Sequence, residues 1–555
     1  MLSALGLALG LLLARAAYLQ LVATDYLQAQ GSARYQRVNH IAATRGMIRD
    51  RKGEPLAVST PVDSVWGHPP TLLGDGHSWD RLAGLLGTDS KRLMQLVRDN
   101  GDKEFLYLKR HLSPSAAGRV MDLKIRGIEI EREYRRYYPA GPVFGQLLGF
   151  TNIDERGQEG LELAFDKTLT GVPGRRRVLR DRVGHVVEQG DEIQPALPGA
   201  DLYISLDARI QYLAYQQLLV AQKQNRARGA SLVAIDARSG EILAMVNVPG
   251  FNPNNRLDRV DGKYRNRAVT DVFEPGSTIK PFTVATALQT KLVGPDSRVE
   301  TAPGTLHIGK HTISDTKDYG LLTVSRVLIK SSNVGAAKIA LQLPEHKLVG
   351  VLENSGFGRT TGVNFPGEVT GHLPQRKHWR EIERATLSFG YGLSSTVLQL
   401  ARAYTIFATD GRLLPVSLQR VSTPPAGKRV FEAKVVRQVR NMLEQAASEH
   451  GTARLAKIPR YRVAGKTGTV HKLVNGQYAE DRYLSIFAGF APVSDPRLVI
   501  VVMVDDPRNK AYYGGEVAAP VFSKVMSGAL RLLNVAPDQP TVPLKQAAYE
   551  GVLVR

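Results

Sequence analysis

The predicted β-strands in the C-terminal part of the chain fall into two groups that a long, mostly helical stretch separates. Apolar runs at 231–235 and 241–247 flank the turn-forming sequence Asp-Ala-Arg-Ser-Gly, which predicts a hairpin. Three further strands are predicted near the end of the chain, at 462–470, 484–490 and 498–504. The last of them is apolar enough to be buried on both faces. The pattern predicts an α+β domain whose early and late strands bracket a helical section, with a closing helix at 517–533.

Three short motifs are spread over the same region: Ser277-Thr-Ile-Lys280, Ser331-Ser-Asn333 and Lys466-Thr-Gly-Thr469. Each motif alone is a weak signal, because patterns with so few fixed positions occur by chance in long proteins. Together they supply a nucleophile, a neighbouring amine, polar groups that can relay a proton, and a cationic strand. A serine enzyme that performs acyl transfer without a histidine needs this set of groups.

The first motif is expected at the start of a helix. Ser277 follows Pro275 and Gly276, which favour a turn, so the serine should lie where unpaired backbone amides point outward. Lys280 is three residues further on, and positions i and i+3 share one helix face. A lysine there can reach the hydroxyl and accept its proton if its own charge is disfavoured. The alternative is an ordinary Ser-x-x-Lys on a solvated helix, which the other two motifs argue against.

The chain resembles the class B penicillin-binding proteins, and most closely their division type. In the C-terminal part the resemblance is carried by the motif contexts and two further regions, at 273–281, 330–335, 464–469, 388–402 and 512–522. In the N-terminal part it is carried by strings that resemble the family's pedestal module, at 45–57, 137–141 and 157–162. The resemblance implies a penicilloyl-serine transferase domain, which has a five-stranded antiparallel sheet flanked by helices and an inserted helical region.

The resemblance also implies roles for the second motif. Ser331 would relay protons to the leaving group, and the Asn333 amide would hold both Lys280 and the substrate amide. Ser332 should point away from the cleft. We expect this motif on a turn between two helices. The alternative is a cluster that only caps a helix, since Ser and Asn favour helix starts.

The third motif is expected on a strand that lines the cleft. Lys466 would offer a fixed positive charge to a substrate carboxylate, and the Thr467 hydroxyl could bind the same group. Gly468 would let the substrate backbone come close. The amides of Ser277 and Thr469 would form the oxyanion hole, which stabilises charge that develops during acyl transfer.

Three tyrosines match an aromatic wall that the family has near this cleft: Tyr483, Tyr512 and Tyr513. Buried structural tyrosines are the alternative. The resemblance requires no cofactor, and none of the twelve histidines lies in a metal-ligand spacing, so we expect no metal site.

The chain should begin with a membrane anchor. Residues 1–22 are mostly apolar and carry a single charge, Arg15, and about 20 such residues cross a bilayer as a helix. A cleavable signal peptide is the alternative, but no small-residue cleavage site follows and no basic n-region precedes the apolar run. Met1 can also be an internal start, and the orientation cannot be derived from flanking charge.

Two larger regions should follow the anchor. Residues 33–200 are expected to form an irregular α+β pedestal without catalytic groups, with helices after Ser78 and Asp89 and a strand at 105–108. The sequence at 195–199 is predicted to be a linker. Residues 201–540 should form the transpeptidase domain and 541–555 a tail. Asp50, Asp154 and Glu159 are expected to be solvated or turn carboxylates.

Composition excludes some functions and leaves others open. The chain of 555 residues has no cysteine, which excludes thiol nucleophiles and thiolate metal sites. A formal charge of +21 is compatible with nucleic acid or an anionic envelope as a partner. Lys and Arg are spread along the chain and no nucleic-acid-binding motif accompanies them, so we expect no nucleic acid partner.

The resemblance implies a D,D-transpeptidase that cross-links peptidoglycan stem pentapeptides during septum formation and is acylated by β-lactams. It also implies a single-pass inner-membrane protein with its catalytic domain in the periplasm, working with a SEDS-type glycan polymerase and other division proteins. Several alternatives remain: an elongation-type transpeptidase, a D,D-carboxypeptidase or β-lactamase, a β-lactam sensor, and an inactive division scaffold.

Overall fold

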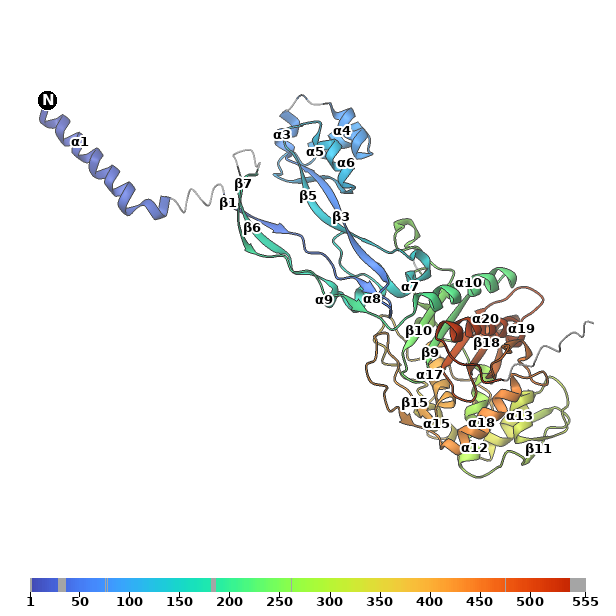
Figure 1. The fold of residues 1–555 in the computed structure, drawn as a ribbon. Helices are drawn as coiled ribbons and strands as arrows, with labels where there is room; N and C mark the ends of the chain where they lie inside the picture. The colour runs from blue at the N-terminus through green and yellow to red at the C-terminus, as the bar shows by residue number, and fades with distance from the viewer. Residues whose placement is uncertain are drawn as a thin grey trace, which may run out of the picture.

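The computed structural model describes residues 2–27, 36–74, 76, 78–180, 186–260, 262–474 and 476–539. The predicted tail at 541–555 lies outside these residues. An N-terminal helix is followed by an elongated pedestal and then by a larger C-terminal domain (Figure 1). The mixed α+β architecture expected from the sequence is therefore confirmed.

The N-terminal helix stands away from the rest of the chain (Figure 1). It consists of α1 (Leu2–Ala17) and a π-helical turn, η1 (Tyr18–Val22). The 18 residues Leu5–Val22 have a mean hydropathy of 1.8, and none of this segment is buried against the protein. The segment is long and apolar enough to cross a membrane, as predicted.

The pedestal is built on a long antiparallel ribbon of β3 (Pro55–Gly67) and β5 (Ile128–Tyr137), in which Val58 pairs with Tyr137. A small head lies at the far end of this ribbon (Figure 1). It contains one strand and four helices: β4 (Leu106–Leu112), α3 (Pro69–Gly74), α4 (Trp79–Leu86), α5 (Ser90–Arg98) and α6 (Pro114–Met121). The helices predicted after Ser78 and Asp89 are α4 and α5, and the predicted strand at 105–108 is the start of β4.

A second pedestal sheet has the strand order β1-β6-β7 and contains β1 (Gln36–Ile41), β6 (Gly174–Arg180) and β7 (Val186–Gln194). A buried ion-pair network joins parts of the pedestal that are far apart in the sequence. The Glu162 carboxylate, which is fully buried, accepts a 2.7 Å hydrogen bond from Nε of Arg45 and another from Nε of Arg136. The network fixes α8 (Gly160–Ala164) and α9 (Asp166–Leu169) against the strands.

The pedestal and the C-terminal domain meet in a close junction. The short strands β2 (Ile48–Arg49) and β8 (Leu202–Tyr203) pair in parallel. Asp50 is 1% exposed, and its carboxylate accepts hydrogen bonds from Lys52 N and Glu54 N and from Ala208 N at the start of α10. Asp50 is thus a turn carboxylate, as expected, but it is buried rather than solvated because it also caps a helix of the next domain.

The C-terminal domain contains one antiparallel sheet of five strands in the order β10-β9-β19-β18-β17. Its strands are β9 (Gly229–Asp236), β10 (Ile242–Val248), β17 (Ala464–Val474), β18 (Gln477–Ala491) and β19 (Leu498–Asp505). The two early and three late strands predicted from the sequence are therefore one sheet. The apolar β19 lies at its centre, between β9 and β18.

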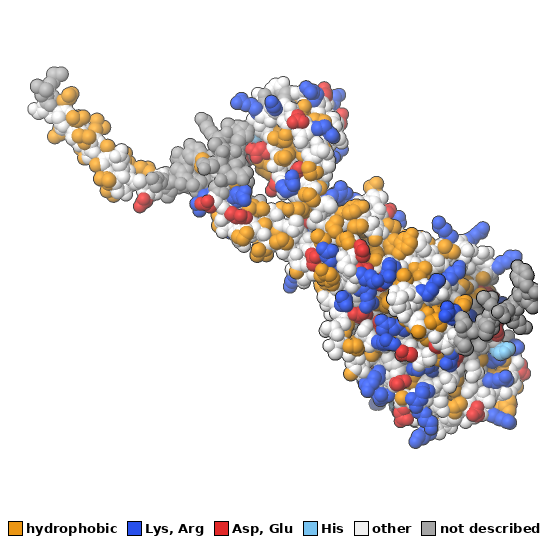
Figure 2. Space-filling view, viewed as in Figure 1, with side chains coloured by type: hydrophobic (Ala, Val, Ile, Leu, Met, Phe, Trp, Pro, Cys, Tyr) orange, Lys and Arg blue, Asp and Glu red, His pale blue; other side chains and the backbone are white. Residues whose placement is uncertain are grey.

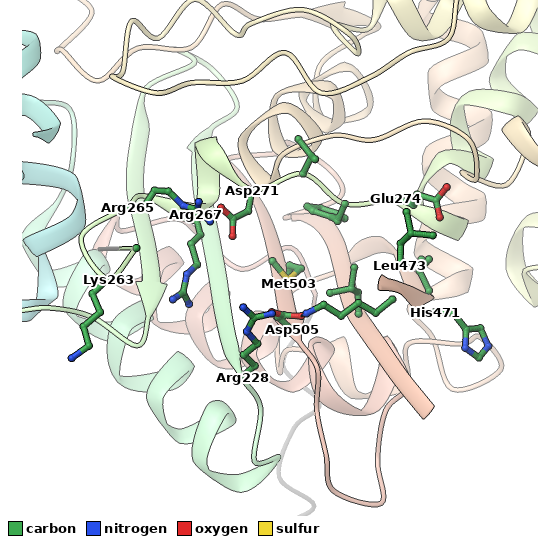
Figure 3. Close-up of a pocket in the computed structure, with 16 residues that line it drawn as sticks. Arg228, Lys263, Arg265, Arg267, Asp271, Glu274, His471, Leu473, Met503 and Asp505 are labelled. Carbon is green, nitrogen blue, oxygen red and sulfur yellow. Dashed lines mark hydrogen bonds and ion pairs between the residues drawn. The ribbon is translucent and has the colours of Figure 1, made fainter. Parts of the chain in front are cut away.

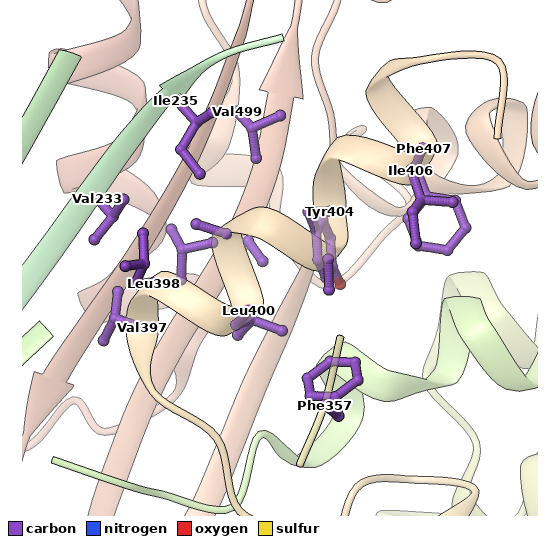
Figure 4. Close-up of a cluster of buried hydrophobic side chains, with 14 of the residues drawn as sticks. Val233, Ile235, Phe357, Val397, Leu398, Leu400, Tyr404, Ile406, Phe407 and Val499 are labelled. Atoms are coloured by element: carbon purple, nitrogen blue, oxygen red, sulfur yellow. The ribbon is translucent and has the colours of Figure 1, made fainter. Parts of the chain in front are cut away.

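Helices cover both faces of this sheet. Leu232 and Ala234 pack in the cluster that includes α10 (Ala208–Gln224) and α20 (Ala519–Leu532). Val233 and Ile235 alternate with them and face α17 (Val397–Ala408) on the other side (Figure 4). Because successive strand side chains point to opposite faces, a strand covered on both sides is apolar throughout.

Helices are the main regular structure of the section between β10 and β17, as predicted. Besides α17, its longer helices are α12 (Lys280–Gln289), α13 (Val324–Lys330), α14 (Asn333–Leu341), α15 (Lys347–Asn354), α16 (Glu381–Leu387) and α18 (Ala433–Ala446). It also contains three small two-stranded sheets, formed by β11 (Arg298–Glu300) with β14 (Leu321–Thr323), β12 (Thr305–Ile308) with β13 (His311–Ser314), and β15 (Arg412–Leu413) with β16 (Lys428–Arg429). The helix predicted at 517–533 is α20, preceded by the short α19 (Gly514–Val517).

On the face of the C-terminal domain that Figure 2 shows, the basic residues do not form one continuous groove. Figure 2 shows Lys and Arg side chains scattered over the visible face of the C-terminal domain, with carboxylates and apolar side chains among them. On this face the distribution matches the spread of charge along the sequence.

Candidate active site

The three sequence motifs meet at the free edge of β17. The first is on the 3-10 turn η4 (Gly276–Ile279), which leads into α12, and the second is on the turn between α13 and α14. Direct contacts between side chains join them. Lys280 Nζ of the first motif lies 2.7 Å from Asn333 Oδ1 of the second, and Lys466 Nζ of the third lies 2.9 Å from Ser331 Oγ of the second.

The backbone around Ser277 is held tightly in place. Gly276 has φ 55°, and a Cβ atom there would lie only 2.5 Å from Val470 Cγ2, so the position requires glycine. The Tyr404 hydroxyl donates to the Thr278 carbonyl at 2.8 Å. Pro281 lies in the first turn of α12, where a missing N–H is tolerated, as predicted.

Lys280 is the most connected group of the site and is fully buried. Its Nζ lies 3.0 Å from Ser277 Oγ, 2.5 Å from the Ser331 carbonyl oxygen, 3.1 Å from Ser331 Oγ and 2.7 Å from Asn333 Oδ1. Burial and, next, the charge of Lys466 lower the pKa of Lys280 well below its ordinary value, while the Asp315 carboxylate opposes this shift. A neutral amine here can donate to Ser331 O and Asn333 Oδ1 and still accept the proton of Ser277.

The second motif forms a strained turn whose two outer residues face Lys280. Ser331 has φ 64°, which puts it in the left-handed region. Ser332 is buried and points away from the cleft, as predicted, because its Oγ accepts from Gly335 N at 2.8 Å and donates to Asp315 Oδ2 at 2.5 Å.

Asp315 is a functional residue that the sequence analysis missed. Its Oδ1 accepts from the backbone N–H groups of Asn333 and Val334, so one carboxylate clamps the start of α14 and the turn before it. It follows β13, far from the motif in the chain. A single aspartate after a short strand carries no recognisable pattern, and only the fold places it here.

Lys466 differs from expectation. Its side chain is fully buried, and its Nζ donates to Ser331 Oγ and, at 3.2 Å, to the Thr467 carbonyl. Burial lowers the pKa of Lys466 to about 7. Lys466 therefore holds its positive charge less firmly in the unliganded site than expected, because the lysine has left water without gaining a carboxylate partner.

The other residues of the third motif line the edge of β17. Thr467 Oγ1 lies 3.0 Å from Thr452 Oγ1, and Thr469 Oγ1 accepts from Gly514 N at 2.9 Å. A Cβ atom on Gly468 would lie 3.0 Å from the Pro275 carbonyl oxygen, so the glycine allows the strand to approach the segment that carries the nucleophile.

The three tyrosines form a continuous aromatic surface beside this edge. The Tyr483 and Tyr512 rings stack with centroids 4.2 Å apart, and the Tyr512 and Tyr513 rings are 4.4 Å apart. Tyr513 is 46% exposed and directly precedes Gly514, whose N–H reaches Thr469. Neither Tyr483 nor Tyr512 belongs to the core, so buried structural tyrosines are the wrong description.

Across the part of the chain that the structure describes, no group of His, Asp and Glu side chains is arranged to hold a metal ion. The chemistry that this arrangement supports is a nucleophilic serine beside a buried amine whose pKa is lowered. The Ser331 hydroxyl connects that amine to a second lysine, Lys466, and Asn333 contacts the amine alone.

Two family models match the chain in succession. The penicillin-binding protein dimerisation domain matches residues 40–204, and the penicillin binding protein transpeptidase domain matches residues 230–527. The second match contains all three motifs.

Proteins with similar sequences carry names from the same family. The peptidoglycan D,D-transpeptidase FtsI of Escherichia coli (strain K12) is 43% identical over 96% of this chain and 91% of its own length. The probable peptidoglycan D,D-transpeptidase PbpC of Pseudomonas aeruginosa is 42% identical over 94% of this chain and 93% of its own. The apo structure of the TP domain of Burkholderia pseudomallei penicillin-binding protein 3 is 42% identical, covers 61% of this chain and 98% of that chain, and has a TM-score of 0.56.

Proposed function

The chain belongs to the class B penicillin-binding proteins, and from this premise we propose that it is a serine-type peptidoglycan D,D-transpeptidase of the division septum. One observation carries the proposal. A fully buried Lys280 has its Nζ 3.0 Å from Ser277 Oγ, and no described carboxylate forms an ion pair with it. The arrangement provides a nucleophile with its base already in contact.

In the first half of the reaction, Ser277 Oγ attacks the penultimate D-Ala carbonyl carbon of a stem pentapeptide and Lys280 Nζ takes the hydroxyl proton. The amides of Ser277 and Thr469 stabilise the oxyanion. As the tetrahedral intermediate collapses, the C–N bond breaks. Ser331 then transfers a proton from the neighbouring lysine ammonium group to the leaving D-Ala amine. The contacts of Ser331 Oγ with both Lys280 and Lys466 support this relay.

In the second half, the amine of a neighbouring stem attacks the ester carbonyl carbon, loses its proton through the same relay, and releases Ser277. Lys466 and Thr467 bind the terminal carboxylate of the donor in the first half. A substrate carboxylate next to Nζ of Lys466 would raise the pKa of this lysine and favour its ammonium form. Substrate binding would therefore restore the positive charge that Lys466 holds only in part when the site is empty. Gly468 gives the substrate backbone access, and the tyrosine surface borders the donor.

The location and partners follow from the anchor and the pedestal. The apolar N-terminal helix would hold the protein in the inner membrane by a single span, with the catalytic domain in the periplasm. We place the anchor at residues 1–22, the pedestal at 33–200, the transpeptidase domain at 201–540 and the tail at 541–555. A SEDS-type glycan polymerase and other division proteins would bind the anchor and pedestal.

The test is the site of covalent labelling. Mass spectrometry of the penicillin-treated protein should place the adduct on the peptide that contains Ser277. Ser277→Ala should keep the parent's melting temperature and remain unlabelled. Ser332→Ala is the matched control, because Ser332 lies in the site but points away, and it should still be labelled at Ser277. An adduct on any other serine would contradict the assignment.

A further inference from the structure

A basic cavity of about 490 Å³ lies at one end of the C-terminal sheet, outside the catalytic cleft. Its walls are the ends of the strands on one side, from Arg228 before β9 to Lys472 and Leu473 of β17, and the segment 262–274 on the other (Figure 3). That segment leads directly to the nucleophile, so one border of the cavity lies three residues before Ser277.

Five cations and three carboxylates line the cavity, and their pairing is incomplete. Two of the cations have partners: Arg265 pairs with Asp271 and Lys472 with Asp505. The remaining three, Arg228, Lys263 and Arg267, have no carboxylate within ion-pair distance among the described residues. An excess of unpaired cations around one cavity favours an anion.

Arg267 is the most informative of the three. Its Nη1 donates to the Val248 carbonyl at 3.2 Å, which orients the guanidinium. Burial lowers the pKa of Arg267, although Asp271 and Asp505 oppose the shift, so the residue carries a desolvated charge that is only partly compensated. Of the three carboxylates, Glu274 is already engaged by Gly392 N–H and the Tyr478 hydroxyl, and burial raises its pKa. Its carboxylate therefore already has two hydrogen-bond donors that are not among the cations of the cavity.

The cavity continues the catalytic cleft along one strand. Lys466 to Thr469 of β17 line the cleft, and Val470 to Leu473 line the cavity. β17 is the last strand of the sheet, so its outer edge can pair with an extended peptide. If the donor's terminal carboxylate lies at Lys466 and its attacked carbonyl near Thr469, the rest of the donor must run toward Leu473. At about 3.3 Å per residue, groups two to four residues from that carbonyl lie about 7–13 Å further along.

We propose that this cavity is a second anion subsite, which binds a carboxylate carried by the acyl donor two to four residues before the bond that Ser277 attacks. The inference rests on the proposed function and extends it to the remote part of the substrate. Exposed Arg228 and Lys263 contact the carboxylate at the mouth, and Arg267 supplies charge from within. The subsite selects acidic donors over their amides, because a carboxylate binds guanidinium with charge-assisted hydrogen bonds and an amide does not.

The experiment compares two thioester donors that carry the same D-Ala acyl group and differ at one remote residue, which is Glu in one and Gln in the other. The second-order rate of Ser277 acylation is measured from thiol release with the full-length protein in detergent. The parent should favour the Glu donor by about tenfold, on the scale of one charge-assisted hydrogen bond. The double variant Arg228→Gln with Lys263→Gln should reduce this preference to about twofold or less.

A matched double variant controls for net charge. Lys223 and Arg226 are exposed cations near Arg228 in the sequence that do not line the cavity, so Lys223→Gln with Arg226→Gln should keep the tenfold preference. Equal rates for the two donors in the parent, an unchanged preference in the first double variant, or the same loss in the control would each overturn the subsite. Penicillin labelling of Ser277 in every variant separates these results from a failure of the proposed function, which would abolish labelling.

Discussion

The pedestal and the catalytic cleft both bury cations, but among the residues described only the pedestal pairs its buried cations with a carboxylate. In the pedestal, the side chains of Arg45 and Arg136 are 2% and 1% exposed, and both donate to the buried Glu162 carboxylate. In the cleft, Lys280 and Lys466 are fully buried, and within the described residues neither forms an ion pair.

The pKa shifts reflect this difference. Burial lowers the pKa of Arg45, but Glu162 and Asp166 outweigh it and the net shift is upward. Burial lowers the pKa of both lysines, and nothing of comparable strength opposes it. A buried cation with a carboxylate partner stays charged and serves stability, whereas one without a partner can lose its proton and serve chemistry.

The largest effect is expected from removing the pedestal carboxylate. Glu162→Gln keeps the side-chain shape but leaves the buried Arg136 without a counter-charge and Arg45 with Asp166 alone, which should reduce the free energy of unfolding by about 3–5 kcal/mol. Thermal and urea unfolding measure this loss. Asp154→Asn is the control, since Asp154 pairs with Arg110 at the surface and its loss should cost within about 1 kcal/mol. If the two variants were equally stable, the pedestal network would not hold the structure together.

The next largest effect concerns the base. Lys280→Arg keeps the positive charge but cannot release its proton near neutral pH, so the second-order rate of penicillin acylation should fall by on the order of 10²-fold or more. A rate close to that of the parent would mean that Lys280 is not the base.

A smaller effect is expected at the positioning carboxylate. Asp315→Asn removes the negative charge of the carboxylate that accepts hydrogen bonds from the N–H groups of Asn333 and Val334. The turn that carries the second motif should then lose its fixed position relative to Lys280. Acylation should slow by about tenfold, because the catalytic groups are still present but are displaced from their reactive positions. A matched measurement on Asp318→Asn, an exposed residue of the same segment, should show the parent's rate. Equal rates for all three proteins would remove Asp315 from the mechanism.

The smallest effect is expected from Lys466→Arg. This variant keeps a cation for the substrate carboxylate and changes only the shape and reach of the side chain. The rate of acylation at pH 7 should therefore fall by less than about tenfold. Rates for Lys280→Arg and Lys466→Arg measured side by side give the comparison directly. A greater loss for Lys466→Arg would reverse the assignment of the two lysines.

The sequence predicted the framework of the molecule because the relevant signals are local. Several local patterns each determine structure over a few residues. They are the apolar strand runs, the turn-forming Pro-Gly before Ser277 and the i, i+3 spacing of Ser277 and Lys280. The apolar β19 was recognisable as a strand buried on both faces for the same reason.

The sequence did not predict features that depend on contacts between distant segments. Asp315 reaches the second motif only through the fold, and the cations of the basic cavity come from strands and loops far apart in the chain. The pKa of Lys466 was also missed, since complete burial is a property of the packed domain and a Lys-Thr-Gly-Thr string does not encode it.

The pH dependence of acylation tests the central claim, that the two buried lysines act in opposite protonation states. The rate should rise with pH as Lys280 loses its proton, well below the ordinary lysine range, and fall as Lys466 loses its charge near pH 7. The second-order rate with a carboxylate-bearing penicillin reports the free enzyme, so the parent should give a bell-shaped profile. Lys466→Arg should lose the descending limb, because arginine does not titrate there. A parent rate that climbs steadily toward pH 10, or a descending limb that persists in Lys466→Arg, would contradict the account.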